Sequence, residues 1–143
     1  MSESAPPRLS ATILLLRDDP GLQVLMVKRH YEIDFASGAL VFPGGKANEE
    51  DSDPAWSDWT DGDFSGTEQA ARISAIREAY EEAGIILARP KSARGAGATL
   101  VGSDVAEALN PMRGPVDRRE QSFLALIQHH DLVLALDALV HFG

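Results

Sequence analysis

The segment 67–84 constrains the fold of this 143-residue chain more than any other part of the sequence. It contains no proline, and its only glycine is Gly84, at a position suited to the left-handed residue that closes a helix. Ser65 and Glu68 fit a capping box at the start, with Thr67 as the alternative cap. Four apolar residues recur at helical spacing and predict one buried stripe: Ile73, Ile76, Tyr80 and Ala83.

Strand patterns come before this helix. Residues 11–16 are almost continuously apolar, and residues 22–29 form a second β-rich run after the turn-forming residues 18–21. Two such runs around a turn predict an antiparallel hairpin. Residues 38–42 predict a short third strand, which Pro43-Gly44-Gly45 should end with a tight turn.

The remaining segments are more varied. Residues 46–66 are rich in acidic residues, Ser, Gly and Pro, which predicts an exposed loop anchored by Trp56 and Trp59. A short helix is expected over 104–109 and a longer one over 117–129, while 132–142 fits either a strand or a helix. We interpret Arg113, Arg118 and Arg119 as a solvated face, with phosphate binding as the alternative, and the histidines 129, 130 and 141 as surface residues.

Composition limits the partners of the chain. The formal net charge of −9 repels the backbone of a nucleic acid, so we expect no nucleic-acid polymer as a partner. The absence of cysteine excludes disulfides, thiolate metal sites and cysteine nucleophiles. We find no signal peptide and no apolar run long enough for a bilayer, so we expect a cytoplasmic protein without a membrane partner.

Three glutamates of the helix carry the chemical prediction. On a helical wheel Glu78, Glu81 and Glu82 lie opposite the apolar stripe, so their carboxylates should share one exposed face. The simplest interpretation is a solvated acidic face. However, like charges at this spacing destabilise a helix, and its C-terminal end disfavours anions. A bound Mg²⁺ would offset both penalties and leave coordination sites for substrate phosphates.

The order of residues around these glutamates resembles the motif of a known family. Arg77-Glu78-Ala79-Tyr80-Glu81-Glu82-Ala83-Gly84 is similar to the second half of the Nudix box, and Phe42-Pro43-Gly44-Gly45 is similar to its glycine start. The usual spacing between the glycine and the arginine is interrupted here by the acidic segment. At the family's first glutamate position, nine residues before Glu78, the chain carries Gln69, so no role is transferred there.

The interrupted box resembles the RP2-type branch of the Nudix hydrolases, also described as nucleoside diphosphate-linked moiety X motif 19 proteins and as coenzyme A and acyl-coenzyme A diphosphatases. The similarity includes residues 27–30, Phe35, Gly38, 41–45 and 71–84. It implies a single α/β (α+β) Nudix domain over residues 1–143, with a mixed sheet between helices and an acidic insertion at 46–66.

The resemblance also implies roles for individual residues. Glu78, Glu82 and Glu81 would be the ligands of a bound Mg²⁺, or of Mn²⁺ in its place. The catalytic residues would be Glu81, Glu82 and Arg77, with Arg77 holding the glutamates in position. Gly44 and Gly45 would lie at the substrate, and with Gly84 they would allow tight backbone turns. Independently of the resemblance, Lys28 and Arg29 end a predicted strand near the expected cleft, so they are candidates for binding a substrate phosphate, with a surface position as the alternative.

The implied activity is hydrolysis of a phosphoanhydride bond in a nucleoside diphosphate derivative, with coenzyme A or acyl-coenzyme A favoured. Nucleotide sugars, dinucleotides and oxidised nucleotides remain alternative substrates, and a non-catalytic nucleotide-binding module is the alternative from another class. The chain stops at Gly143, where the resembling proteins continue. We therefore expect either a fragment or a sheet completed by a partner, such as a second copy in a homodimer.

Overall fold

Helix α1 (Gly66–Ala83) occupies the centre of the molecule. The computed structural model describes residues 9–18, 21–29 and 39–141. The predicted helix is confirmed, and Gly84 ends it with a φ of 70°. The predicted capping box is wrong, because the Ser65 side chain makes no capping hydrogen bond and Glu68 pairs with Arg72 instead.

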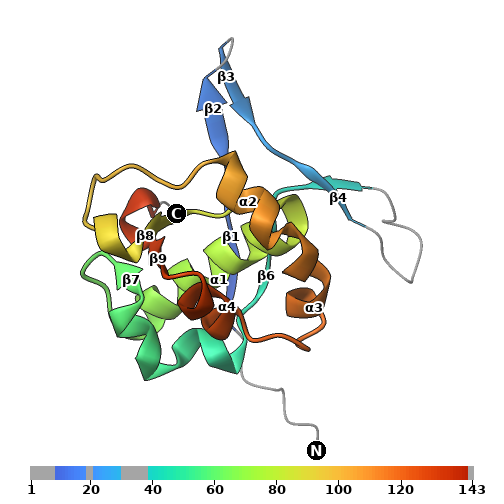
Figure 1. Cartoon of the computed structure of the whole chain (residues 1–143). Coiled ribbons are helices and arrows are strands. Elements are labelled where there is room, and N and C mark those ends of the chain that lie inside the picture. The colour runs from blue at the N-terminus through green and yellow to red at the C-terminus, as the bar shows by residue number, and fades with distance from the viewer. Residues whose placement is uncertain (1–8, 19–20, 30–38, 142–143) are drawn as a thin grey trace, which may run out of the picture.

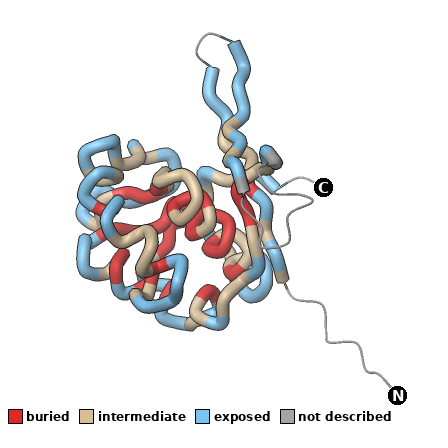
Figure 2. Tube along the Cα trace, turned by 90° about the vertical axis from the view of Figure 1, so that its right-hand side faces the viewer, coloured by how far each residue is buried: buried red, intermediate tan, exposed pale blue. Residues whose placement is uncertain are grey.

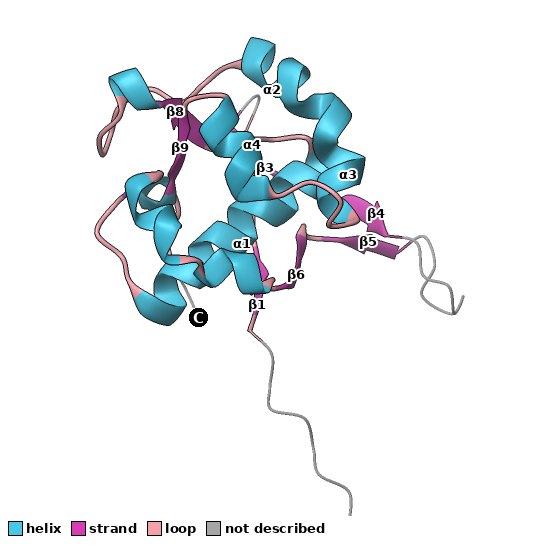
Figure 3. Cartoon of the chain, turned by 60° about the horizontal axis from the view of Figure 1, so that its bottom comes forward, coloured by secondary structure: helices cyan, strands magenta, loops and turns pink. Residues whose placement is uncertain are grey.

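The helix is buried on two opposite sides. Ala75 and Ala79 pack on Ile13, whereas Ile73, Ile76 and Tyr80 face the larger core. Figure 3 shows the strands β1 (Ser10–Thr12) and β6 (Gly44–Lys46) on one side of α1. The helices α3 (Arg113–Asp117) and α4 (Phe123–His129) lie on the other. The expectation of a single buried stripe is therefore wrong, since small alanines allow a second layer to approach the opposite side.

The first two predicted strands each divide in two because they change partners. β1 pairs with β6, and the chain then continues into β2 (Leu16–Asp18), which pairs with β3 (Leu22–Val24). Likewise β4 (Val27–Arg29) pairs with β5 (Ala39–Val41). The predicted hairpin is thus confirmed only in part, as the shorter pair β2–β3, which projects from the body with exposed residues (Figure 2).

Several sequence features lie outside the described residues. These are the segment 1–8, Asp19 and Pro20 of the predicted turn, the segment 30–38 with Phe35 and Gly38 of the family resemblance, and Phe142 and Gly143.

A mixed three-stranded sheet lies under the larger core. Its central strand β9 (Leu132–Ala135) runs parallel to β7 (Thr60–Asp61) and antiparallel to β8 (Ala88–Pro90). The choice between strand and helix after residue 132 is thereby decided, with the 3₁₀ helix η6 (Leu136–Ala138) following the strand. Helix α4 (Phe123–His129) packs on β9.

The helix predicted over 117–129 is wrong in extent. Helix α2 (Ser103–Leu109) leads through the 3₁₀ helix η5 (Asn110–Met112) into α3 (Arg113–Asp117), and α4 begins only at Phe123. Arg119 has a φ of 60°, which a helix cannot include, and Ser122 caps the new helix by accepting a hydrogen bond from the backbone N–H of Ala125.

The acidic segment 46–66 is more ordered than the predicted exposed loop. It contains the 3₁₀ helices η2 (Glu49–Ser52) and η3 (Pro54–Asp58) as well as β7. Trp56 is fully buried beside Phe123, which confirms its predicted anchoring role. Asp61 forms ion pairs with Arg89 and Arg94, near the 3₁₀ helix η4 (Lys91–Ala93). The acids of this segment therefore attach it to the rest of the molecule.

Within the described ranges, no helix is both long enough and apolar enough to cross a bilayer.

Candidate active site

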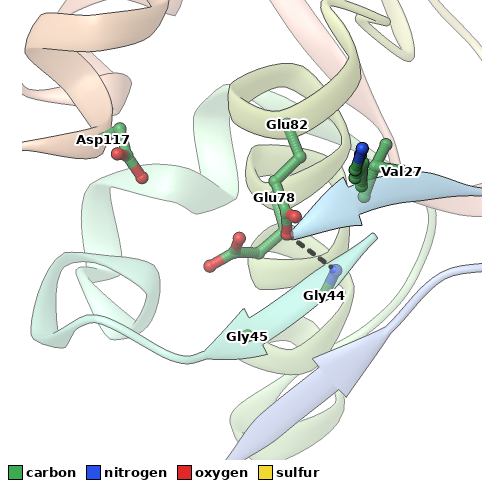
Figure 4. Close-up of a pocket in the computed structure, with 7 residues that line it drawn as sticks. Val27, Gly44, Gly45, Glu78, Glu82 and Asp117 are labelled. Carbon is green, nitrogen blue, oxygen red and sulfur yellow. Dashed lines mark hydrogen bonds between the residues drawn. The ribbon is translucent and has the colours of Figure 1, made fainter. Parts of the chain in front are cut away.

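Two of the three predicted glutamates meet the predicted glycines. Glu78 and Glu82 face β6, where a cavity of about 430 Å³ opens between the helix and the strands (Figure 4). The side chains and backbone that line it are those of Val27, Lys28, Gly44, Gly45, Glu78, Glu82 and Asp117. The structure thus brings residues of both halves of the box, more than 30 positions apart, into one site.

Gly44 and Gly45 serve this site through the absence of a side chain. They do not form the predicted tight turn but lie in β6, opposite Thr12 and Ala11. A Cβ atom on Gly45 would lie 2.5 Å from Oε1 of Glu78, and one on Gly44 would lie 2.5 Å from the carbonyl oxygen of Ala11. The backbone N–H of Gly44 also donates a hydrogen bond to Oε1 of Glu82 at 3.0 Å. The missing side chains therefore let β6 approach β1 at Gly44 and the carboxylate of Glu78 at Gly45.

The buried guanidinium of Arg77 connects the carboxylates. Its Nη1 donates to Glu81 at 2.9 Å and to Glu78 at 3.2 Å. Its Nε and Nη2 donate to the two carboxylate oxygens of Asp51 at 3.2 and 3.1 Å, and Nη2 also donates to the carbonyl oxygen of Lys46. Such charge-assisted, two-point contacts fix orientation as well as position. The placement of Arg77 agrees with the positioning role expected for it.

Glu81 departs from the predicted arrangement. Its side chain is only 3% exposed and lies against Arg77, and it does not line the cavity. Glu78 is also largely buried, with 12% of its side chain exposed. The prediction that the three glutamates share one exposed face is therefore wrong. Across the described ranges, no group of three or more Asp, Glu or His side chains is arranged to hold a metal ion.

The electrostatics of these glutamates favour the protonated form. Burial, followed by the charge of Glu81, raises the pKa of Glu78 to about 7, although Arg77 opposes the shift. Burial also raises the pKa of Glu81 above its usual range, against the effect of Arg77. Burial disfavours an ionised carboxylate, and a like charge nearby adds to the cost. A cation in the cavity would relieve both effects.

Asp51 is a site residue that the sequence analysis missed. It is almost fully buried and forms its ion pair with Arg77 across 26 positions of sequence. Nine residues before Glu78, where the resemblance would place the first acid, the chain carries Gln69. Counting forward from Gly45 by the family's spacing reaches Asp51, six positions later. This forward count is the signal in the sequence that could have indicated Asp51.

Asp117 is the second missed residue. It ends α3 and lines the cavity across from Glu78 (Figure 4). Arg113, at the start of α3, donates hydrogen bonds of 3.1 Å to the carbonyl oxygens of Tyr80 and Glu81. These bonds satisfy carbonyls at the end of α1 and attach α3 beside the site. No local sequence pattern indicated this contact.

The other candidate residues are placed as follows. Lys28 is exposed at the cavity, whereas the side chain of Arg29 lies outside what the structure describes. Arg118 pairs with Glu120 at the surface, and Lys91 lies over the ring of Trp59. The histidines 129, 130 and 141 are all exposed.

The geometry agrees with a known fold. No protein-family model matches the sequence. Superposition identifies the fold as that of the Nudix hydrolases, which confirms the predicted mixed α/β class.

The matching structure is the crystal structure of a Nudix hydrolase from Alicyclobacillus acidocaldarius, with a TM-score of 0.68 and 21% sequence identity. The match covers 94% of this chain and 59% of that chain. At this identity the similarity concerns the fold, and the chain spans little more than half the length of the matching protein.

Proposed function

We propose that this protein is a Mg²⁺-dependent hydrolase that cleaves the phosphoanhydride bond of a nucleoside diphosphate derivative. The observation that carries the proposal is the meeting of Glu78 and Glu82 with the glycine strand β6 around one cavity. Carboxylates beside backbone that has no side chains leave room for a cation and a diphosphate. The Nudix fold supports the same chemistry.

The residues of the cavity fit a Mg²⁺ ion. Mg²⁺ prefers carboxylate oxygens, needs only one or two of them from the protein, and completes its shell with water and substrate phosphates. Glu78 and Glu82 would hold the ion, with Mn²⁺ as the alternative metal, and Glu81 would assist through its contact with Arg77. When bound, the ion would polarise a phosphoryl oxygen, screen the charge of the leaving group and lower the pKa of a water molecule.

The chain's own residues would do the rest by positioning. Arg77 orients Glu78 and Glu81, and Gly44 orients Glu82. Lys28, and Arg29 beside it in the sequence, would bind the substrate phosphates. Water adds to one phosphorus, the bridging P–O bond breaks, and the bridging oxygen leaves with the other phosphate, so two phosphate monoesters form and one proton is released.

Coenzyme A and acyl-coenzyme A are the proposed substrates, on the strength of the sequence resemblance. Nucleotide sugars, dinucleotides and oxidised nucleotides carry the same diphosphate and are the alternative substrates.

A non-catalytic nucleotide-binding module is the second candidate. The burial of Glu81 against Arg77 favours it, because only two glutamates are left to line the cavity. A module of this kind would bind the diphosphate without cleaving it.

Hydrolysis assays with matched variants separate the two candidates. The parent protein is incubated with each diphosphate of the panel and Mg²⁺, and phosphate monoester products are resolved by chromatography. We expect turnover of coenzyme A that EDTA abolishes and that Glu82→Gln lowers by at least about a hundredfold. Glu68→Gln is the control, because it makes the same change on the same helix at an exposed side chain outside the cavity.

The outcomes are distinct. Turnover of another panel member in preference to coenzyme A would support the hydrolase proposal but would refute coenzyme A as its substrate. Metal-dependent binding of a diphosphate without turnover would support the binding module. Equal loss of activity in the Glu68 and Glu82 variants would remove the proposed role of the cavity.

A further inference from the structure

A second cavity lies next to the proposed active site. It has a volume of about 370 Å³, and the same three segments contribute to both cavities. The first cavity is lined by Gly44, Gly45, Glu78 and Asp117. The second is lined by their sequence neighbours, which are residues 47–50, Arg77 and Val116. Because adjacent residues line the two spaces, the two cavities lie close together along these three segments.

One of three neighbouring arginines remains available there. Arg113 is engaged by the carbonyl oxygens of α1, and Arg118 is paired with Glu120. Arg119 is exposed and lines the second cavity, and no ion pair or side-chain hydrogen bond to it is found within the described ranges. Its φ of 60° turns the backbone between α3 and α4, and Arg119 lines the cavity whereas Arg118 pairs with Glu120.

The acidic neighbours of Arg119 are partly engaged. The carboxylate of Glu50 accepts hydrogen bonds from Oγ of Ser122 and from the backbone N–H of Leu124. Arg77 also lines the wall, but its charge is taken up by ion pairs with Asp51, Glu78 and Glu81. Glu49 is an exposed carboxylate that opposes an anion. A guanidinium that binds two oxygens of one phosphate is strong enough to outweigh a single solvated carboxylate.

We infer that Arg119 is a specificity residue that binds a phosphate monoester carried by the substrate beyond the diphosphate that is cleaved. The inference rests on the proposed function, because it assumes that the diphosphate occupies the glutamate site. It narrows the substrate class to diphosphate esters with a third phosphate group. It also assigns the connection between α3 and α4 as the wall that selects among nucleoside diphosphate derivatives.

The test compares two substrates that differ by one group. Coenzyme A carries a phosphate monoester on its ribose, and 3′-dephospho-coenzyme A does not. We expect Arg119→Gln to lower kcat/KM for coenzyme A by about tenfold to a hundredfold, the factor that corresponds to a charged hydrogen bond. The value for the dephosphorylated compound should change by less than about twofold. Glutamine has the same backbone restrictions as arginine at this φ, so folding should not be affected.

Arg118→Gln is the matched control, since it removes an adjacent charge that points to Glu120 and should leave the preference intact. Equal effects of Arg119→Gln on both compounds, or no effect on either, would overturn the inference.

Equilibrium binding provides a readout without catalysis. Adenosine 3′,5′-bisphosphate and adenosine 5′-monophosphate differ by the same phosphate, and calorimetry on the full chain measures both. We expect the parent to bind the bisphosphate about tenfold more tightly and Arg119→Gln to lose this difference. A parent without turnover that still shows the preference would refute the hydrolase while retaining the phosphate site. Equal affinity of the parent for both nucleotides would refute the phosphate site regardless of activity.

Discussion

Replacing Glu78 with glutamine should stabilise the metal-free protein at pH 8 while abolishing its hydrolase activity. The neutral amide still offers Arg77 an acceptor oxygen, so the hydrogen bond between these residues is retained. What is lost is the charge of a buried carboxylate that faces Glu81 and Glu82. Stability and activity should therefore change in opposite directions.

The magnitude follows from the pKa of Glu78, which burial raises from 4.5 to about 7. Each pKa unit corresponds to 1.36 kcal/mol, so the ionised side chain costs the folded state at most about 3 kcal/mol. Because the folded-state pKa is the higher one, the protonated group favours folding below about pH 4.5. That contribution is lost as the pH rises to 7. Glu78→Gln should thus match the parent near pH 4.5 and exceed it at pH 8.

Urea unfolding in EDTA, followed by the fluorescence of the buried Trp56, measures this difference at both pH values. Mg²⁺ should stabilise the parent more at pH 8 than at pH 5, because protons compete for the same carboxylate, and it should stabilise the variant least. Glu68→Gln controls for loss of an exposed charge on the same helix. A Glu78→Gln protein less stable than the parent at pH 8 without metal would refute the electrostatic argument.

Two further substitutions test the geometry of the site. Gly45→Ala should lower kcat/KM by about a hundredfold, because the new Cβ would lie 2.5 Å from Glu78 and must displace it. Gly102→Ala is the control, since its new Cβ meets only ordinary contacts. Equal activity and equal Mn²⁺ affinity of the two variants would contradict the close approach of strand and helix. Asp51→Asn should lower the free energy of unfolding by about 3 kcal/mol in urea titrations, since it breaks a buried ion pair with Arg77. It should also lower activity, because the glutamates that Arg77 holds would be displaced. A loss of stability below about 0.5 kcal/mol would show that the position of Arg77 does not depend on Asp51.

Local patterns accounted for the elements whose causes are local. The helix ending at Gly84, the β2–β3 hairpin and the helix over 104–109 each follow from residues within a few positions of one another. The interruption of the predicted helix between Asp117 and Phe123 is also local, but the sequence does not indicate it. It includes Arg119 at a positive φ, a conformation that arginine rarely adopts and therefore does not predict.

The candidate site also contains some features that the sequence indicated and others that it did not. The motif placed Glu78, Glu82 and the two glycines correctly in one cavity. It did not indicate that Glu81 would be buried against Arg77, since a helical wheel separates two faces but does not say whether the second face is covered.

By itself, the sequence determined the central helix and its glycine end, because backbone preference and side-chain spacing are properties of neighbouring residues. The association of the glycine motif with the glutamate motif was implied by the family resemblance. Tertiary structure alone decided that Asp51 pairs with Arg77 and that Arg113 attaches α3 beside the glutamates. The energies of these contacts depend on burial of charged groups contributed by distant segments. Burial exists only once those segments have packed together.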